Sequence, residues 1–319
     1  MVRIAIAGGS GEVAREVIDA LVAASDNDDI IIFSQNDMHS QSNNPHGLSW
    51  RKVDYNDSNS LVQALRDIHT VLSFIQLLHD PENKSQKNLI DAAILAGVKR
   101  FAPSEWGSRG AAAMPWWAGK DDIKEYLKQV NTNKKVLEYT LFQPGLFMNY
   151  LATPFKTSSH LTPLNTFIDL KNQRAVMVDG YSNAALVLTT VQDMAAVVAR
   201  AVHFEGQWPV VGGIRGNRVT ISQLLEIGKR VRDGSFTVET VKLHDLEAGR
   251  LNTSWTLEAR HHSVSTQQET EMLKSVLVGV LVSTVKGGWD VSDEWNQLLP
   301  DYKFSGVEEF LEDVPWDAN

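Results

Sequence analysis

The chain has 319 residues, of which 43% are hydrophobic and 22% are charged, a composition ordinary for a water-soluble globular protein of one large or two modest domains. The formal net charge of -9 and the lack of a basic tract argue against nucleic acid as a partner. The absence of cysteine excludes disulfides, thiolate zinc sites and cysteine nucleophiles.

The first half of the chain alternates strand and helix signals. Short apolar runs predict strands over residues 2–7, 30–33, 50–53, 70–75, 100–103 and 139–143. Helical spacing of apolar residues predicts helices over 12–23, 57–65, 83–96 and 120–130. Asp57 or Ser58 is expected to cap the second helix, and Gly97 to end the third. Strands separated by such helices predict an α/β protein with a doubly wound parallel sheet.

The pattern changes after about residue 150, where prolines and small polar residues indicate loops. Short strands are predicted over 176–178, 185–189 and 236–243, and helices over 190–202, from 219 onward and over 269–281. Thr220 or Ser222 is expected to cap the helix that opens at 219. The stretch 252–268 is polar, as expected of a mobile loop. Four aromatic residues near the C-terminus are interpreted as packing residues: Trp289, Trp295, Tyr302 and Phe304. We expect a nucleotide-binding domain over 1–150, with a returning segment near 188–204, and a smaller α+β substrate-cap domain over 151–319.

The first fourteen residues predict a dinucleotide site. The run 2–7 leads without a gap into Gly8-Gly9-Ser10-Gly11-Glu12-Val13-Ala14. A strand that feeds a glycine turn and then a helix is the arrangement of the Rossmann fold, although such a segment also suits a plain turn. Gly8 would allow the tight turn, and Gly11 would let the backbone approach a pyrophosphate. The helix N-terminus would then offer N–H groups and a positive dipole end to the phosphates.

The end of the second predicted strand bears on the choice between NAD and NADP. An acidic residue there would bind the ribose hydroxyls of NAD, and a nearby arginine would bind the extra phosphate of NADP. The sequence has neutral Ser34, Gln35 and Asn36, followed by Asp37. These residues argue mildly against NAD and do not favour NADP, and a solvated turn is the alternative.

Two further strand ends carry candidate cofactor contacts. Asp54 follows the third strand, where it would bind the adenine amino group or cap the next turn. Phe74, Ile75 and Gln76 end the fourth strand, at the carboxyl edge where open α/β sheets bind their ligands. Gln76 is polar in an otherwise apolar run, which favours a contact with the cofactor.

The segment Val98-Lys99-Arg100-Phe101-Ala102-Pro103-Ser104-Glu105-Trp106-Gly107 resembles the V-K-R-F-x-P-S-E-[FW]-G signature of isoflavone reductase-like and NmrA-like proteins, an atypical branch of the short-chain dehydrogenase/reductases. Gly8, Gly11 and Ala14 match the N-terminal turn of that family. Residues 120–124 resemble its K-x-x-[IV]-R segment, with lysine for the last arginine. Residues 139–147 resemble the strand and loop that reach over the nicotinamide. The resemblance covers nearly the whole chain.

The resemblance implies NADP(H) as the cofactor and a catalytic role for Lys120. In the family, the matching lysine lies near the nicotinamide, where it positions the ribose and moves a proton. Burial beside a cofactor would lower the pKa of such a lysine and let it exchange a proton. From the residues alone, Lys120 is a surface lysine on a charged helix. Trp116 stands where ordinary short-chain dehydrogenases have their acidic tyrosine, so that mechanism is excluded here.

The resemblance also extends the site beyond Lys120. It adds Pro103, Ser104, Gln143, Pro144 and Phe147 to the cofactor contacts. Trp116 and Trp117 form an unusual apolar pair that would line a pocket for a flat aromatic molecule, and simple loop packing is the alternative. The remaining candidates for the pocket wall are Trp106, Phe147, Met148 and Tyr150.

The leading hypothesis is an NADP(H)-dependent oxidoreductase that acts on a small aromatic or heterocyclic specialised metabolite. One alternative is a non-redox cyclase or isomerase that keeps the dinucleotide as a scaffold. The other is an NmrA-like regulatory protein that senses dinucleotides, which would need no buried base at Lys120. No motif encodes the substrate or the oligomeric state.

Neither a membrane segment, a metal site nor a hydrolase site is expected. The apolar stretch from Val276 to Val282 is far too short to span a bilayer, and the N-terminus lacks a signal-peptide pattern. The nine histidines show no metal-ligand spacing, and His261 and His262 lie in a polar stretch. No G-x-S-x-G elbow surrounds Ser104. We therefore expect a cytoplasmic protein.

Overall fold

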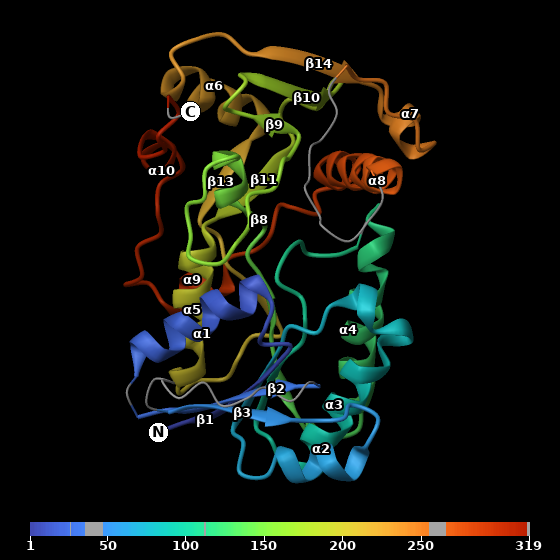
Figure 1. The fold of residues 1–319 in the computed structure, drawn as a ribbon, viewed down its shortest axis with the longest axis vertical. Helices are drawn as coiled ribbons and strands as arrows, with labels where there is room; N and C mark the ends of the chain where they lie inside the picture. The colour runs from blue at the N-terminus through green and yellow to red at the C-terminus, as the bar shows by residue number, and fades with distance from the viewer. Residues whose placement is uncertain (26, 36–46, 112, 255–265, 318–319) are drawn as a thin grey trace.

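The computed structural model describes residues 1–25, 27–35, 47–111, 113–254 and 266–317. Two regions follow one another along the long axis of the molecule (Figure 1). The lower region contains the six-stranded sheet of the N-terminal half, and the upper region contains two three-stranded sheets with their helices. The predicted α/β class and the second domain are therefore confirmed.

The six-stranded sheet has the order β3-β2-β1-β4-β5-β6. All five strand pairs in it are parallel. Its strands are β1 (Arg3–Ala7), β2 (Asp29–Ser34), β3 (Leu48–Lys52), β4 (Thr70–Ser73), β5 (Arg100–Ala102) and β6 (Glu138–Tyr139). The chain builds outward from β1 in one direction and then from β4 in the other. Such a reversal opens a crevice at the carboxyl ends of β1 and β4, where doubly wound folds bind ligands.

Helices cover both faces of this sheet. α1 (Glu12–Ala24) and α5 (Val191–His203) share one hydrophobic core with Ile4 and Ile6 of β1. α2 (Ser58–Ala64), α3 (Lys84–Ala96) and α4 (Ala118–Val130) lie on the other face, where they share a core with Ala5 and Ala7. Successive residues of β1 thus point to opposite faces, as the pleat of a strand requires.

The predicted helix caps are confirmed at three positions. Asp57 caps α2 by accepting a hydrogen bond of 3.0 Å from the N–H of Ser60. Gly97 ends α3 with a φ of 80°, a left-handed conformation that favours glycine. Thr220 caps α6 (Ile221–Val231) through a capping box with Gln223. These caps place the ends of α2, α3 and α6 close to where the sequence predicts them.

The predicted strand over 139–143 is divided in two. The part that follows Thr140 is β7 (Leu141–Gln143), which leaves the six-stranded sheet to pair with β12 (Val211–Gly213). The prediction of one continuous strand is wrong because residues far along the chain supply a second pairing partner. Beyond β7 lie the 3-10 helix η4 (Met148–Ala152) and the two remaining sheets. The first sheet contains β8 (Leu146–Phe147), β11 (Ala185–Thr189) and β13 (Asn217–Thr220). The second contains β9 (Ile168–Asp169), β10 (Arg174–Val178) and β14 (Thr237–Val241).

The C-terminal part is mainly helical. It contains α7 (Leu243–Glu247), α8 (Thr266–Val285), α9 (Glu294–Leu298) and α10 (Val307–Glu312). α8 is longer than the predicted helix over 269–281, and its first residues belong to the stretch predicted as a polar loop. Residues 255–265 of that stretch lie outside the described residues. Within the described parts of the chain, no helix is both long and apolar enough to cross a membrane.

The two regions are joined through α1. α5, which lies in the predicted returning segment, packs beside α1 (Figure 1). The Glu16 carboxylate accepts hydrogen bonds from the N–H groups of His160, at 2.6 Å, and Leu161, at 3.1 Å. Trp208 and Trp295 lie in the same core as α1, so residues well beyond 204 also return to it. The boundary near residue 150 stays a prediction.

Candidate active site at the carboxyl edge of the sheet

Two positions in the turn after β1 have room only for glycine. Gly8 has a φ of 75°, and a Cβ atom there would lie 2.7 Å from the carbonyl oxygen of Phe74. A Cβ atom at Gly9 would lie 2.4 Å from a methyl group of Ile32. Gly11 begins α1, and no side chain of the described residues caps that helix end. The turn therefore presents backbone, with Ser10 exposed beside it and Glu12 and Val13 opening the helix.

The predicted cofactor contacts at the neighbouring strand ends differ in their exposure and in their hydrogen bonds. Ser34 is half-buried and Gln35 is exposed, whereas Asn36 lies outside the described residues. The Asp54 carboxylate accepts a hydrogen bond of 2.8 Å from the N–H of Asn56, as a turn-capping residue does. Tyr55, which the sequence reading missed, is buried with its hydroxyl against the backbone of Gly8, and this burial raises the pKa of the hydroxyl. Its position directly after the predicted contact Asp54 is the feature of the sequence that could have identified it.

The residues after β4 divide between core and surface. Phe74 is buried and stacks on Trp106, with ring centroids 4.3 Å apart, whereas Ile75 is half-buried. Gln76 is exposed and its amide oxygen lies 3.1 Å from Nδ1 of His79 in η1 (Leu77–His79). Gln76 is thus accessible at the edge, as its predicted role requires.

The segment after β5 buries the predicted pocket residue Trp106. Its ring lies between Phe74 and Phe142, the latter with a centroid 5.4 Å away, and its indole N–H donates a hydrogen bond of 2.8 Å to the carbonyl of Ser73. Trp106 has a φ of 40°, which is uncommon for a bulky residue, and this stack holds it there. The structure places Trp106 in the hydrophobic core. Of its neighbours, Pro103 is buried and Ser104 is half-buried.

Lys120 lies in the first turn of α4 and is buried, with 7% of its surface exposed. Its Nζ donates a hydrogen bond to the backbone carbonyl of Glu105 and lies 3.5 Å from the centroid of the Trp117 ring. Burial lowers the pKa of Lys120 to about 8, with the Glu105 carboxylate acting in the opposite direction. The alternative of a solvated surface lysine is wrong because the beginning of α4 packs against the segment after β5.

A buried ion pair lies directly beside Lys120. The Glu105 carboxylate is 2% exposed, and Lys124 Nζ lies 2.8 Å from its Oε1. Burial alone would lower the pKa of Lys124, but the carboxylates of Glu105 and Asp121 raise it above its ordinary value. Gln143 Nε2 lies 3.5 Å from the same Oε1. Within the described residues, the buried Oε1 of Gln143 has no hydrogen-bond partner, so it is an acceptor that a bound molecule would satisfy.

Polar contacts fix the position of the first turn of α4. Asn83, in η2 (Pro81–Asn83), has a left-handed backbone with a φ of 57°. Its buried amide donates a hydrogen bond of 3.1 Å to the carbonyl of Gly119. A Cβ atom at Gly119 would lie 2.6 Å from Oδ1 of Asn83, so glycine permits this close approach. Lys120, the next residue, is thereby held against the sheet edge.

The predicted tryptophan pair separates into two roles. Trp117, in η3 (Pro115–Trp117), lies over Lys120 and makes an edge contact with Trp289, with centroids 5.7 Å apart. Trp116 packs on α8, where a Cβ atom at Gly279 would lie 2.3 Å from its ring. The indole N–H of Trp289 is buried and has no partner among the described residues. Trp289 is therefore the packing residue that the sequence predicts, and it supports Trp117, whose ring covers Lys120.

The remaining predicted pocket residues follow β7. Pro144 and Phe147 are buried, and Phe147 makes an edge contact with the half-buried Tyr150, with centroids 5.8 Å apart. Burial and the nearby Glu12 carboxylate raise the pKa of the Tyr150 hydroxyl. Met148 is fully buried in the core of the second domain. The structure thus gathers Lys120, Trp117 and Gln143 around Glu105, and places Met148 apart from them.

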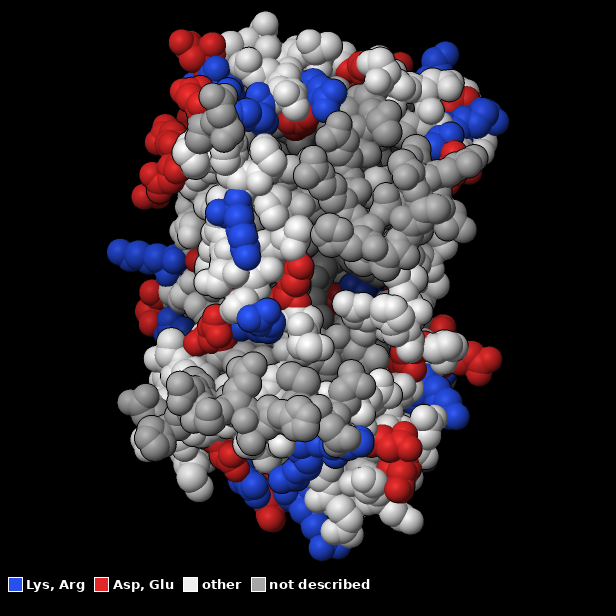
Figure 2. All heavy atoms as spheres, viewed as in Figure 1, with Lys and Arg blue, Asp and Glu red and all other residues white. Residues whose placement is uncertain are grey.

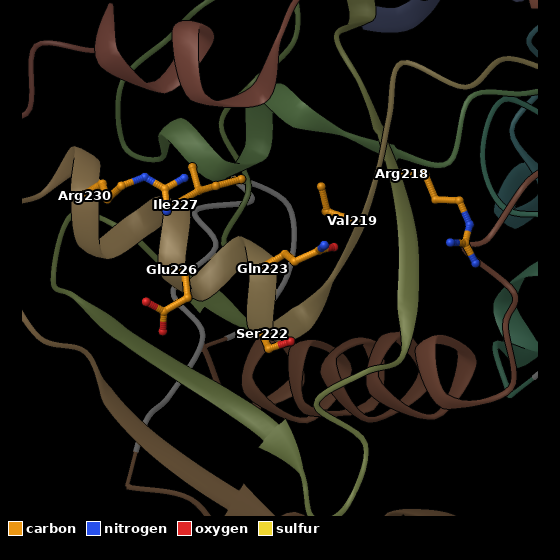
Figure 3. Close-up of a pocket in the computed structure, with 7 residues that line it drawn as sticks. All are labelled: Arg218, Val219, Ser222, Gln223, Glu226, Ile227 and Arg230. Atoms are coloured by element: carbon orange, nitrogen blue, oxygen red, sulfur yellow. The ribbon is translucent and has the colours of Figure 1, made fainter.

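A separate groove of about 410 Å³ lies along α6 in the second domain (Figure 3). Its seven lining residues are all outside the predicted site, namely Arg218, Val219, Ser222, Gln223, Glu226, Ile227 and Arg230. Its two arginines are paired, since Arg218 lies 2.7 Å from Asp290 and Arg230 lies 2.6 Å from Glu308. On the face in Figure 2, acidic and basic side chains are likewise intermixed.

Known proteins are similar to this chain in both sequence and fold. The model of the NmrA-like family matches residues 2–311. Oxidoreductase BOA1 of Botryotinia fuckeliana is 31% identical over 239 residues, covering 72% of this chain and 76% of that protein. Oxidoreductase swnN of Metarhizium robertsii is 24% identical over an alignment of 336 residues, covering 98% and 96%.

The fold is also that of a solved structure. The NADPH-dependent quinone oxidoreductase QOR2 from Escherichia coli, crystallised with NADPH, matches with a TM-score of 0.68 at 19% identity, covering 97% of this chain and 98% of that one. The glycine turn, the segment after β5 and the beginning of α4 thus lie in a chain that the family model matches almost from end to end. On this evidence, the chain belongs to the NmrA-like family.

Proposed function

We propose that this protein is an NADP(H)-dependent oxidoreductase that acts on a small aromatic or heterocyclic metabolite in the cytoplasm. The observation that carries the proposal is Lys120, a buried amine with a pKa of about 8 at the carboxyl edge of the sheet. Residues with perturbed pKa values in such places are candidates for acid–base chemistry. A protein that only senses dinucleotides needs no buried base at this position.

The residues at the sheet edge fit a dinucleotide. Gly8 and Gly9 leave no room for side chains, and α1 begins at Gly11 with its end open to an anion. We infer that this backbone would hold the pyrophosphate. The free acceptor of Gln143 would then face the nicotinamide end. The choice of NADP over NAD is supported by the NADPH complex of the structural neighbour. The sequence between β2 and β3 has no arginine, so it adds no support of its own.

The contribution of this chain to the chemistry would be a proton. When bound, NADPH supplies a hydride to the substrate. With a pKa of about 8, Lys120 is mostly protonated at neutral pH and would donate its proton to the reduced substrate. Trp117, supported by Trp289, would provide an apolar wall beside the amine, which favours a flat substrate. The names of the relatives, which include oxidoreductases and a quinone oxidoreductase, support this reaction class.

The experiment measures NADPH binding first and turnover second. The full chain is titrated with NADPH, and the nicotinamide absorbance is then followed with a panel of quinones and aromatic heterocycles. We expect binding below about 1 mM and loss of the absorbance with at least one compound. No binding at about 1 mM would remove the proposal. Product formation without any absorbance change would indicate the non-redox alternative, a cyclase or isomerase.

A further inference from the structure

We propose that Glu105 is a positioning residue, and that its buried ion pair with Lys124 fixes the direction in which the Lys120 ammonium points. The inference rests on the proposed function, because it assigns the acid–base role to Lys120. Glu105 belongs to the family signature in the sequence, and Lys124 is one of several lysines on α4. The proposed function assigns no role to Glu105 or to Lys124.

Besides the contact with Gln143, three contacts hold residue 105, one at each of its N–H, carboxylate and carbonyl groups. Its N–H donates a hydrogen bond of 2.7 Å to the carbonyl of Pro103. Its carboxylate lies 2.8 Å from Lys124 Nζ, and its carbonyl accepts the hydrogen bond from Lys120 Nζ. Lys120 and Lys124 are one turn apart on α4, so their side chains lie on the same face. One residue thus anchors both amines.

The burial of the pair makes this arrangement rigid. The Glu105 carboxylate is 2% exposed, and the Lys124 side chain is 19% exposed. An unpaired charge in such a place is strongly unfavourable, so the two side chains stay together. The backbone carbonyl that holds Lys120 belongs to the same residue, so the ion pair restrains the carbonyl as well as the carboxylate. The Lys120 amine is therefore kept beside the Trp117 ring and the sheet edge.

The charges that face Lys120 come from two elements. Glu105 is on the segment after β5, and Lys124 and Asp121 are on α4, whereas Trp117 contributes an uncharged ring from η3. The two carboxylates raise the pKa of Lys120 and the Lys124 ammonium lowers it. Removing the Glu105 charge should therefore lower the pKa of Lys120 further, and Lys124, left with Asp121 as its carboxylate partner at 3.0 Å, would act in the same direction.

The test is a titration of Lys120 itself in the full chain. Lysine labelled with ¹³C at Cε is incorporated, the Lys120 signal is assigned by its loss in Lys120→Met, and its shift is followed against pH without cofactor or substrate. We expect the Glu105→Gln variant to lower the midpoint by about 1 pH unit or more. Lys124→Arg keeps the ion pair and should keep the midpoint. The matched control is Glu138→Gln, which removes a partly buried carboxylate 3.0 Å from Arg100 and should leave Lys120 unchanged.

Turnover then separates positioning from folding. In Glu105→Gln, we expect kcat to fall while NADPH affinity is kept, with Lys124→Arg close to wild type. Should Glu105→Gln fail to fold, as judged by circular dichroism, the kcat of Lys124→Met provides the comparison, since this variant also removes the ion pair. Its Lys120 midpoint should rise, because the Lys124 ammonium lowers the pKa of Lys120. An unchanged Lys120 midpoint and kcat in Glu105→Gln, an equal effect in Glu138→Gln, or wild-type kcat in Lys124→Met would each overturn the proposal. The titration needs no NADPH, so its result is independent of whether the proposed function holds.

Discussion

The sheet edge around Lys120 and the groove along α6 both place basic side chains next to acidic ones, but they differ in burial. Lys120 is 7% exposed, whereas the side chains of Arg218 and Arg230 are 49% and 57% exposed. Solvent screens the charges in the groove, and exposed pairs of this kind contribute little to stability. Burial lowers the pKa of Lys120, which suits the acid–base role proposed for it. A hollow surface alone therefore does not indicate a functional site, and the buried charge is what supports the proposed one.

The largest expected effect comes from removing the buried amine. Lys120→Met keeps the length and the apolar contacts of the side chain but has no proton to exchange. We expect turnover to fall at least about 100-fold, the lower bound for loss of a general acid or base, with NADPH affinity nearly unchanged. Steady-state kinetics and a binding titration measure the two quantities. Turnover close to wild type in this variant would remove Lys120 from the chemistry.

Stability should also depend on this amine, through pH. The unfolded chain keeps the lysine proton up to about pH 10.5, while the folded chain releases it near pH 8. Between these values the unfolded state binds more protons, so the folded state gains stability as pH rises. Relative to Lys120→Met, wild type should gain about 3 kcal/mol over this window. Denaturant unfolding of both proteins across the window measures it, and parallel pH curves would contradict a buried ammonium.

A smaller effect is expected at the glycine turn. A methyl group at Gly11 would meet only the Gly8 carbonyl, at 3.5 Å, so Gly11→Ala should fold normally. The methyl group would nevertheless stand where a pyrophosphate approaches the backbone. We expect about a tenfold loss of NADPH affinity, or about 1.4 kcal/mol, without a change in melting temperature. Gly110→Ala, with open space around it, is the control and should change neither quantity. Equal NADPH affinity in both variants would argue against phosphate binding at this turn.

The smallest effect is expected in the groove along α6. Arg218→Ala combined with Arg230→Ala removes both exposed ion pairs of that groove. We expect no measurable change in turnover or NADPH affinity and only a slight change in stability, because solvent already screens these charges. The same assays as for Lys120→Met provide the comparison. A large loss of turnover in the double variant would show that the groove also contributes to activity, although its charges are exposed.

Local sequence signals predict the fold well, and they predict the site less well. The caps at Asp57, Gly97 and Thr220 depend on a few adjacent residues, and all three are where the pattern predicts them. The division of the strand at Thr140 depends on β12, some seventy residues later in the chain, and no local pattern indicates it.

The site residues follow the same rule. The glycine turn is local, and its crowding is evident once Phe74 and Ile32 are placed. Whether Lys120 is buried depends on Glu105 and Trp117, which reach it from different elements, so the residues alone favour a surface lysine. Trp106 shows the opposite case, since a conspicuous aromatic residue predicted to line a pocket packs in the core.

The most direct test is a diffraction structure of crystals grown with NADP+. The account predicts the pyrophosphate on the backbone of residues 8–13 and the Lys120 amine within hydrogen-bond reach, about 3 Å, of the nicotinamide ribose or of a substrate above the ring. A dinucleotide bound away from the glycine turn, or a Lys120 amine that points into solvent when the dinucleotide is bound, would contradict it.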